Sequence, residues 1–288
     1  MKIRRVQRLR RSSVESEDAD SMSHVVNGAE LGCLDPFVKF EEFTIRKPGV
    51  ISEHPHRGVE TVTYIWEGAT EDEDCFGNIG RLEPGDVQWV TAGRGLVHAR
   101  VPTSDEPVWG LQIWLNLPGE NKMAAPVYQE IRASEISRFE RDGASVAVIH
   151  GGDALGYGSG PQSFTFYQGH FKLVSKAFFC PFSHTFTPQT QVAPHTAVLF
   201  CDGDCVKVQN QGAEVCRFVL VASEPTGEPI VHKGQFVMTT EEEIAQAIED
   251  YENCTNGFEK ALNWKSKMCE RVRKGNTKYN DQTTESES

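Results

Sequence analysis

Residues 54–68 read HPHRGVETVTYIWEG, two histidines separated by one proline and followed by a run of β-branched and aromatic residues. Val, Ile, Thr, Tyr and Trp favour strands, so Val59–Trp66 is predicted to be one. Side chains at positions i and i+2 of a strand point the same way, so His54 and His56 can face one ion together. The pair alone is weak evidence for a metal site, because a polar strand face explains it equally well.

Other short runs of this kind follow along the chain, separated by turn sequences. Val108–Leu117 alternates apolar residues with Gln112, Trp114 and Asn116, which is the period of a strand. Pro84-Gly85-Asp86 is a typical tight turn. The remaining runs are Asp86–Thr91, Ser145–His150, Ser163–Phe171, Thr196–Phe200, Cys205–Gln209 and Val215–Val221. Many short strands joined by turns predict an all-β chain built as a sandwich or barrel.

One helix is expected near the C-terminus. Thr240 can cap it, and Glu243 completes a capping box. An apolar stripe runs from Ile244 to Tyr251, and Asn256-Gly257 supplies a stop. A shorter helical stretch is expected from Phe258 to Trp264.

The basic first eleven residues allow two interpretations. They contain six cations and no acid, which matches a nuclear or mitochondrial address, but Ile3, Val6 and Leu9 also alternate as in a strand with a solvated basic face. We favour the strand, because short basic runs match targeting motifs by chance. The polar, acidic stretch Glu15–Ser23 is expected to be a loop.

The chain divides into two β domains. Leu82–Trp89 and Leu199–Val208 both contain a Gly-Asp turn followed by an alternating run, which indicates a faint repeat. The expected parts are an N-terminal strand and acidic loop (1–23), a first domain (24–118), a polar, helix-prone linker (119–142), a shortened second domain (143–267) and a disordered tail (268–288).

Composition narrows the class of protein. The 288 residues carry 29 Lys and Arg against 41 Asp and Glu, a net charge of −12 that argues against a broad nucleic-acid-binding face. No run approaches the roughly 20 apolar residues of a membrane span. Eight cysteines without a secretory signal indicate a reducing compartment and free thiols.

An ordered set of longer motifs resembles the pirin family of the cupin superfamily. The segments that carry the resemblance are Leu34–Phe37, His54–Gly58, Glu60–Val62, Pro84–Trp89, Thr91–Gly95, His98, Gly110–Leu117, Gly227–Ile230, Gly234, Phe236–Met238, Asn256–Glu259 and Trp264–Ser266. The resemblance spans roughly residues 30–267 and is interrupted within Lys172–Pro194. It implies two tandem cupin barrels of the jelly-roll type, a bicupin, with iron in the first. The interruption suggests that the second barrel has lost a strand pair, through divergence or an alternative transcript.

The resemblance also implies a ligand set of three His and one Glu. His54, His56 and His98 match the histidines, but Arg100 stands where the family has its Glu. Strand parity puts Arg100 on the same face as His98, where a cation repels Fe(II) and an anionic ligand is missing. Three outcomes are open: three histidines hold the metal, Glu60 joins the ligands or pairs with Arg100, or the pocket is a metal-free relic.

Two classes of function follow from the resemblance. The first is a nuclear and cytoplasmic coregulator of transcription, a monomer that binds Rel-type (NF-kappaB) factors or their partners without reading DNA itself. Arg57, Arg94 and Arg100 could then form a local basic patch. The second is a quercetin 2,3-dioxygenase, in which the metal binds a flavonol and Glu60 is a candidate base. A metal-free cupin acting as a binding module is the further alternative.

Weaker motifs point to no chemistry. Cys201 and Cys205 lack a partner pair at zinc-finger spacing, so thiols in a strand explain them better. Gly93-Arg94-Gly95 is too short for a phosphate-binding loop. The second domain has His170, His184 and His195 but no histidine pair two positions apart.

Overall fold

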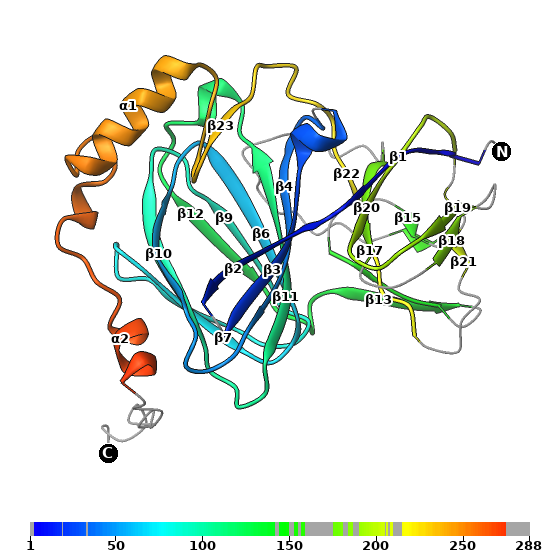
Figure 1. Ribbon diagram of the computed structural model, residues 1–288, viewed down its shortest axis with the longest axis horizontal. Coiled ribbons are helices and arrows are strands. Elements are labelled where there is room, and N and C mark those ends of the chain that lie inside the picture. Colours follow the sequence, from blue (N-terminus) through cyan, green and yellow to red (C-terminus); the bar gives the residue numbers. More distant parts are fainter. Residues whose placement is uncertain are drawn as a thin grey trace.

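Two β-structures lie side by side in the computed structural model, a large barrel formed by the N-terminal half and a smaller unit beside it (Figure 1). The structure describes residues 3–18, 20–32, 34–141, 144–149, 153–154, 157–158, 175–180, 184–186, 190–204, 206, 208–209 and 215–274. Strands dominate, as the prediction of an all-β cupin chain requires. No helix among the described residues is long and apolar enough to cross a membrane.

The barrel consists of two antiparallel sheets. The larger has the strand order β12-β9-β6-β11-β4-β3-β2 and the smaller the order β5-β10-β7-β8. The bounds of the larger sheet are β2 (Ser13–Asp18), β3 (Ser21–Asn27), β4 (Phe37–Ile45), β6 (Val59–Glu67), β9 (Val87–Thr91), β11 (Val108–Asn116) and β12 (Val127–Ile131). Those of the smaller are β5 (Ile51–His56), β7 (Thr70–Asp74), β8 (Ile79–Leu82) and β10 (Leu96–Pro102).

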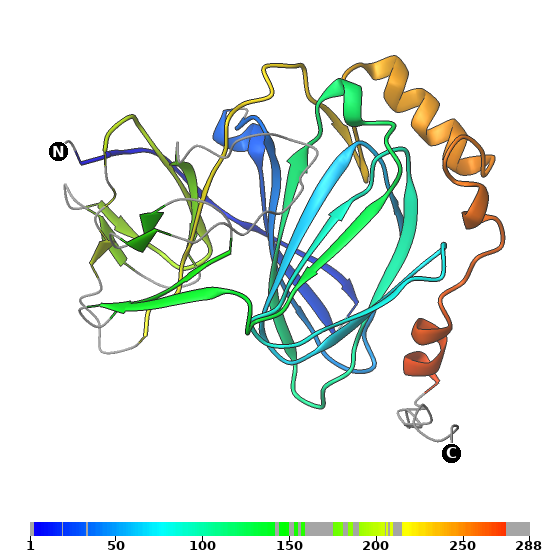
Figure 2. The same cartoon turned by 180° about the vertical axis from the view of Figure 1, so that it is seen from behind.

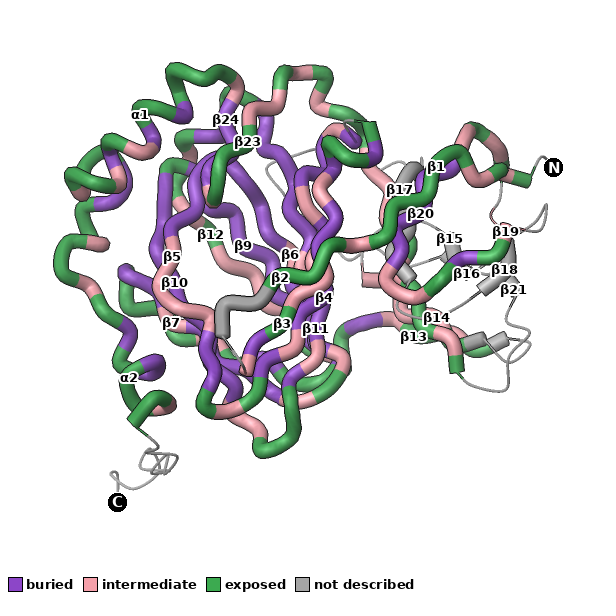
Figure 3. Tube along the Cα trace, viewed as in Figure 1, coloured by how far each residue is buried: buried purple, intermediate pink, exposed green. Residues whose placement is uncertain are grey.

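Strand β11 shows how the barrel is oriented. Its apolar residues Leu111, Ile113 and Leu115 are buried on the outside of the barrel, in one cluster with Ala197 and Leu199 of the smaller unit. The opposite face of the strand lines the barrel interior. Figure 3 shows the resulting band of buried residues where the two units meet. The predicted alternation is confirmed, and its polar side is the one that points inward.

The smaller unit takes its edge strand from the N-terminus of the chain. Strand β1 (Val6–Arg11) pairs antiparallel with β20 (Thr196–Phe200), which confirms that the basic segment forms a strand. The four-stranded sheet has the order β1-β20-β17-β22. The other strands of the unit are β13 (Ser137–Arg141), β14 (Ala144–Val148), β15 (Asp153–Ala154), β16 (Tyr157–Gly158), β17 (Ser175–Cys180), β18 (His184–Phe186), β19 (Thr190–Val192), β21 (Val208–Gln209) and β22 (Val219–Ala222). The predicted strand Ser163–Phe171 lies outside the described residues. Of the segment Lys172–Pro194, strands β17, β18 and β19 are described, whereas residues 172–174, 181–183 and 187–189 are not.

Strands occur in the predicted acidic loop and in the predicted helix-prone linker. The acidic stretch Glu15–Ser23 falls on the hairpin of β2 and β3, so the prediction of a loop is wrong there. An edge strand needs only one neighbour, and main-chain hydrogen bonds hold it whatever its side chains are. In the predicted linker 119–142, a short 3-10 helix (Gly119–Asn121) leads into β12, which pairs with β9 in the barrel sheet. Burial of Ile131 against Val87 anchors this strand.

The C-terminal segment returns to the first barrel. Strands β23 (Val231–Lys233) and β24 (Phe236–Met238), helix α1 (Glu241–Glu252), the 3-10 helix Glu259–Ala261 and helix α2 (Lys267–Arg273) pack along it, as Figure 2 shows from behind. Thr240 and Glu243 form the expected capping box, although α1 ends four residues before Asn256. Helix α2 lies where a disordered tail was predicted from residue 268, so the tail prediction is wrong for this helix, and residues 275–288 lie outside the description.

Candidate metal centre

Three imidazoles meet inside the first barrel. His54 and His56 lie on β5, and His98 lies directly opposite His54 on β10. Each ring offers a nitrogen within 4.8 Å of the others, and no other group of this kind occurs in the described parts of the chain. The rings of Trp114 and His56 pack in a T-shaped arrangement, with their centroids 4.9 Å apart, and Trp114 closes one side of the cluster. Local strand geometry brings the β5 pair together, whereas the pairing of β5 with β10 brings in His98.

A hydrogen bond to the backbone leaves the lone pair of His54 directed at His98. His54 Nδ1 lies 2.7 Å from the carbonyl oxygen of Ser52, so Nδ1 carries the proton and Nε2 presents a lone pair. That Nε2 lies 3.0 Å from His98 Nε2. Two nitrogens bound to one ion at about 2.1 Å and at right angles would lie ~3 Å apart. The spacing therefore fits two ligands of a common ion.

Unpartnered nitrogens support the same interpretation. Both ring nitrogens of His56 and Nδ1 of His98 are buried and make no hydrogen bond of normal geometry, although the backbone of Gln235 approaches His56. A buried polar atom without a partner is costly, and most such atoms in proteins are satisfied. A metal ion would satisfy these nitrogens, so the residues fit one.

All three imidazoles are held in the neutral form that ligates metals. Burial lowers the pKa of His54, and it lowers the pKa values of His56 and His98 well below 6.5. The neighbouring imidazoles and the cation of Arg100 add to the effect on His98. Because a protonated ring cannot bind a metal, these shifts keep the cluster ready to bind at neutral pH.

Arg100 lies in the barrel interior, as strand parity predicts, and a carboxylate holds it there. Its Nε and Nη2 lie 2.6 and 2.8 Å from the two oxygens of Asp72 on β7, and both side chains are buried. Nη2 also contacts Thr63 and Gln88 at 3.3 Å. The carboxylate of Asp72 therefore balances the charge of Arg100 beside the imidazoles. This pairing could not be predicted from the residue types alone.

Neither of the roles considered for Glu60 at the histidine cluster is seen. Glu60 is not one of the grouped metal-ligand residues, and its carboxylate accepts a 2.6 Å hydrogen bond from Thr91. Burial raises the pKa of Glu60. Glu60 does not pair with Arg100, which was one of the open alternatives, because the β7–β10 register gives Arg100 the carboxylate of Asp72 instead.

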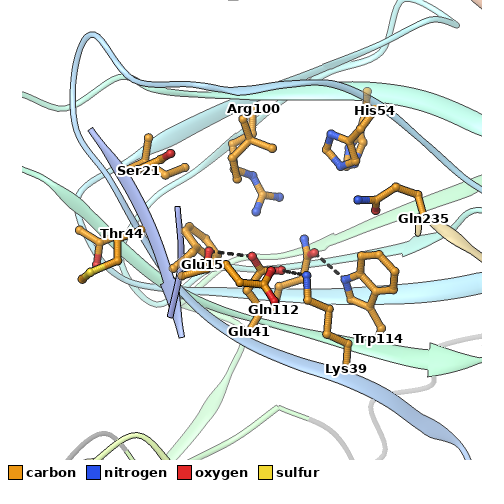
Figure 4. Close-up of a pocket in the computed structure, with 16 residues that line it drawn as sticks. Glu15, Ser21, Lys39, Glu41, Thr44, His54, Arg100, Gln112, Trp114 and Gln235 are labelled. Carbon is orange, nitrogen blue, oxygen red and sulfur yellow. Dashed lines mark hydrogen bonds and ion pairs between the residues drawn. The ribbon is translucent and has the colours of Figure 1, made fainter. Parts of the chain in front are cut away.

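A cavity of about 210 Å³ reaches the cluster from the side of His54 and His98. Figure 4 shows the side chains that line it, with Arg100 and His54 on one wall and Lys39, Glu41, Gln112 and Trp114 on the other. Lys39 and Glu41 form an ion pair at 2.8 Å, and Trp114 donates to Gln112 at the same distance. Sequence reasoning missed Asp72, Lys39 and Glu41, whereas the alternation of β11 could have pointed to Gln112.

The expected basic patch does not form. The Arg57 guanidinium is fully buried, where it binds Asp250 of α1 at 2.6 Å and donates to the Arg94 and Asn256 carbonyls. Arg100 is enclosed in the barrel, so only Arg94 of the three arginines is exposed. Arg57 instead attaches the C-terminal helix to the barrel.

The remaining candidates have structural partners. His195 binds Glu42 of the first barrel at 2.7 Å and stacks on His24, so it joins the two units. His170 and Cys205 lie outside the described residues. The cysteines whose state the structure describes, Cys75, Cys201, Cys216, Cys254 and Cys269, are free thiols, as predicted.

Comparisons with known proteins agree with this architecture. The Pirin family model matches residues 17–115, and the model of the Pirin C-terminal cupin domain matches residues 180–257. Rat Pirin is 43% identical over 263 residues, which cover 84% of this chain and 90% of the rat protein. Human Pirin is 42% identical over 259 residues, which cover 83% of this chain and 89% of the human one.

Solved structures show the same fold. A quercetin 2,3-dioxygenase from Acinetobacter baumannii superposes with a TM-score of 0.74 at 23% identity, covering 88% of this chain and 98% of its own. The bacterial pirin YhhW from Escherichia coli, solved in complex with nickel(II), gives a TM-score of 0.54 at 16% identity, covering 76% of this chain and 99% of its own.

Proposed function

This chain belongs to the pirin family of cupin proteins, and we propose that His54, His56 and His98 hold a divalent metal ion in its first barrel. The observation that carries the proposal is the set of buried imidazole nitrogens that face one another without other partners. Three imidazoles with open positions suit Fe(II), the metal that the family resemblance implies, and also Mn, Ni or Cu.

The chain's own residues have defined parts in such a site. The Ser52 carbonyl fixes the tautomer of His54, and the Trp114 ring limits the movement of His56. A bound metal would act as a Lewis acid and as a template for an oxygen-bearing ligand. Because Arg100 stands where an anionic ligand is expected, a metal held by the three histidines would keep a higher positive charge.

We propose a metal-dependent oxidoreductase of the quercetin 2,3-dioxygenase type as the first candidate activity. The cavity beside His54 and His98 supports it, because a substrate needs a path to the open positions of the metal. A structural neighbour of the same fold bears the name of this enzyme. Glu60 does not line the cavity, so the proposal assigns it no role as a base.

We propose nuclear coregulation of Rel-type transcription factors as the second candidate, and membership of the pirin family supports it. In this role the redox state of the metal would alter the affinity for a protein partner. The net charge of −12 is consistent with a protein that binds a factor and not the DNA itself.

Anaerobic loading with Fe(II) tests these proposals. Elemental analysis should find about one iron per chain, and His98→Ala should lose it. Quercetin consumption that needs O2 and disappears in His98→Ala would support the dioxygenase. Iron without turnover, together with different affinities of the Fe(II) and Fe(III) forms for a recombinant Rel-homology domain, would support the coregulator. Loading is repeated with Mn, Ni and Cu. A folded protein that takes up none of these metals and no Fe(II) would refute the metal site.

A further inference from the structure

Arg100 keeps one end of its guanidinium unused. Nε and Nη2 make all of its hydrogen bonds to the described residues, to Asp72, Thr63 and Gln88, and Nη1 makes none. The side chain is only 3% exposed, yet it lines the cavity that reaches His54 and His98. Two N–H donors of a buried cation are therefore available to whatever enters the cavity.

Among the described residues, no carboxylate is hydrogen-bonded to Nη1. Asp72 is engaged with the opposite edge of the guanidinium, and Glu41 is bound by Lys39 and Ser23. Glu15, the other acid of the lining, is exposed. An anion in the cavity would thus meet a donor pair, while the Arg100–Asp72 pair stays intact.

A second polar atom faces the same space. Gln235 lines the cavity, and its Oε1 is buried without a hydrogen-bond partner. A ligand with a hydroxyl group would satisfy this amide, whichever way its oxygen and nitrogen are turned. The volume of about 210 Å³ is below the range of roughly 300–1,000 Å³ that is usual for drug-sized ligands, so the ligand should be small.

We propose that this cavity binds a small hydroxycarboxylic acid, whose carboxylate accepts hydrogen bonds from Arg100 Nη1 and whose hydroxyl meets Gln235. Arg100 stands at the position where the family resemblance places a carboxylate. The protein therefore offers a cation there, to which the carboxylate of a ligand can bind. The functional meaning of this binding rests on the proposed metal site. The contacts of the ligand with Arg100 and Gln235 do not require the metal.

Calorimetry of the metal-free full chain with lactate, lactamide and inorganic phosphate tests the proposal. Lactate should bind at one site per chain, and lactamide, which lacks the charge, about 10- to 100-fold more weakly, as expected for charge-assisted hydrogen bonds. Equal binding of lactate and lactamide, or tighter binding of phosphate, would overturn the assignment to carboxylates.

Variants of the cavity residues test whether lactate binds inside the cavity. Arg100→Gln combined with Asp72→Asn removes both charges of the pair together, so the barrel should keep its fold, and lactate should bind at least ten-fold more weakly. Arg94→Gln removes an exposed cation and should change nothing. If the folded double variant binds lactate like the wild type, or if Lys39→Gln abolishes binding while the double variant retains it, the proposal fails.

A parallel Fe(II) titration separates the two proposals. Binding of lactate by a chain that takes up no iron would leave the carboxylate site standing and refute the metal site. A chain that takes up iron but binds no lactate, either with or without the metal, would leave the metal site standing and refute the carboxylate site.

Discussion

Arg100 on β10 and Asp72 on β7 are opposite each other in the sheet and form a two-point ion pair inside the barrel, with N–O distances of 2.6 and 2.8 Å. Burial alone would lower the pKa of Arg100, but the pair with Asp72 outweighs it and raises the pKa. A cation therefore occupies the position where the family resemblance places an anionic ligand, and a carboxylate from the next strand balances it.

Restoring the acid at position 100 should require a change at position 72. Arg100→Glu alone puts two buried carboxylates opposite each other and should cost about 3–5 kcal/mol of the free energy of unfolding. Arg100→Glu combined with Asp72→Asn removes the repulsion and should raise the Fe(II) affinity at least about ten-fold, since it adds an anionic ligand. Urea denaturation and anaerobic calorimetry measure the two effects. Unchanged Fe(II) affinity in a folded double variant would contradict the prediction.

The attachment of the C-terminal helix should depend on Asp250. Its carboxylate lies 2.6 Å from the buried guanidinium of Arg57, and Asp250→Ala leaves that cation without its partner. We expect a loss of about 3–5 kcal/mol in the free energy of unfolding, measured by urea denaturation. Glu249→Ala removes an exposed carboxylate from the same helix and is the matched control, with an expected change below about 0.5 kcal/mol. Similar losses in both variants would rule out a specific role for the pair.

Lys122 should hold the barrel rim together. Its buried ammonium donates to the carbonyls of Gly58 and Val237 and to the Asn116 side chain, at 2.7 to 3.0 Å. Lys122→Met leaves these oxygens without their donor and should destabilise the protein by about 2–4 kcal/mol in thermal or urea unfolding. Lys233→Met, at an exposed position of β23, serves as the control. A loss no larger than that of the control would show that water replaces the ammonium.

The metal-free protein should lose stability as the pH falls below about 6.5, where histidines of the unfolded chain take up protons. In the folded state, burial depresses the pKa values of His54, His56 and His98, so these rings stay neutral. The unfolded state then binds more protons, and stability falls by up to about 1.4 kcal/mol per pH unit per histidine. Urea unfolding between pH 7 and pH 5 measures this slope. Replacing all three histidines by Gln should flatten it, and an unchanged slope would assign the effect to other groups.

Sequence reasoning succeeded where the pattern is local. The strand that begins at Val59, the alternation of β11 and the Thr240–Glu243 capping box all follow from residues within a few positions of each other. It failed at Glu15–Ser23, because a polar edge strand has the composition of a loop. It also failed for Glu60 and Asp72, because the choice of partner for Arg100 depends on which strand lies beside β10.

The amino-acid sequence by itself determined the strands, the capped helix and the histidine pair, since backbone propensity and side-chain alternation act over short distances. Only the tertiary structure decided which face of β11 points inward. The smaller unit covers Leu111, Ile113 and Leu115, so burial of apolar surface between the two units leaves Gln112 and Trp114 to line the cavity beside the histidines. Strand pairing in the smaller sheet sets the register of β7, β10 and β5, and with it the positions of Asp72, Arg100 and His98 around one small space.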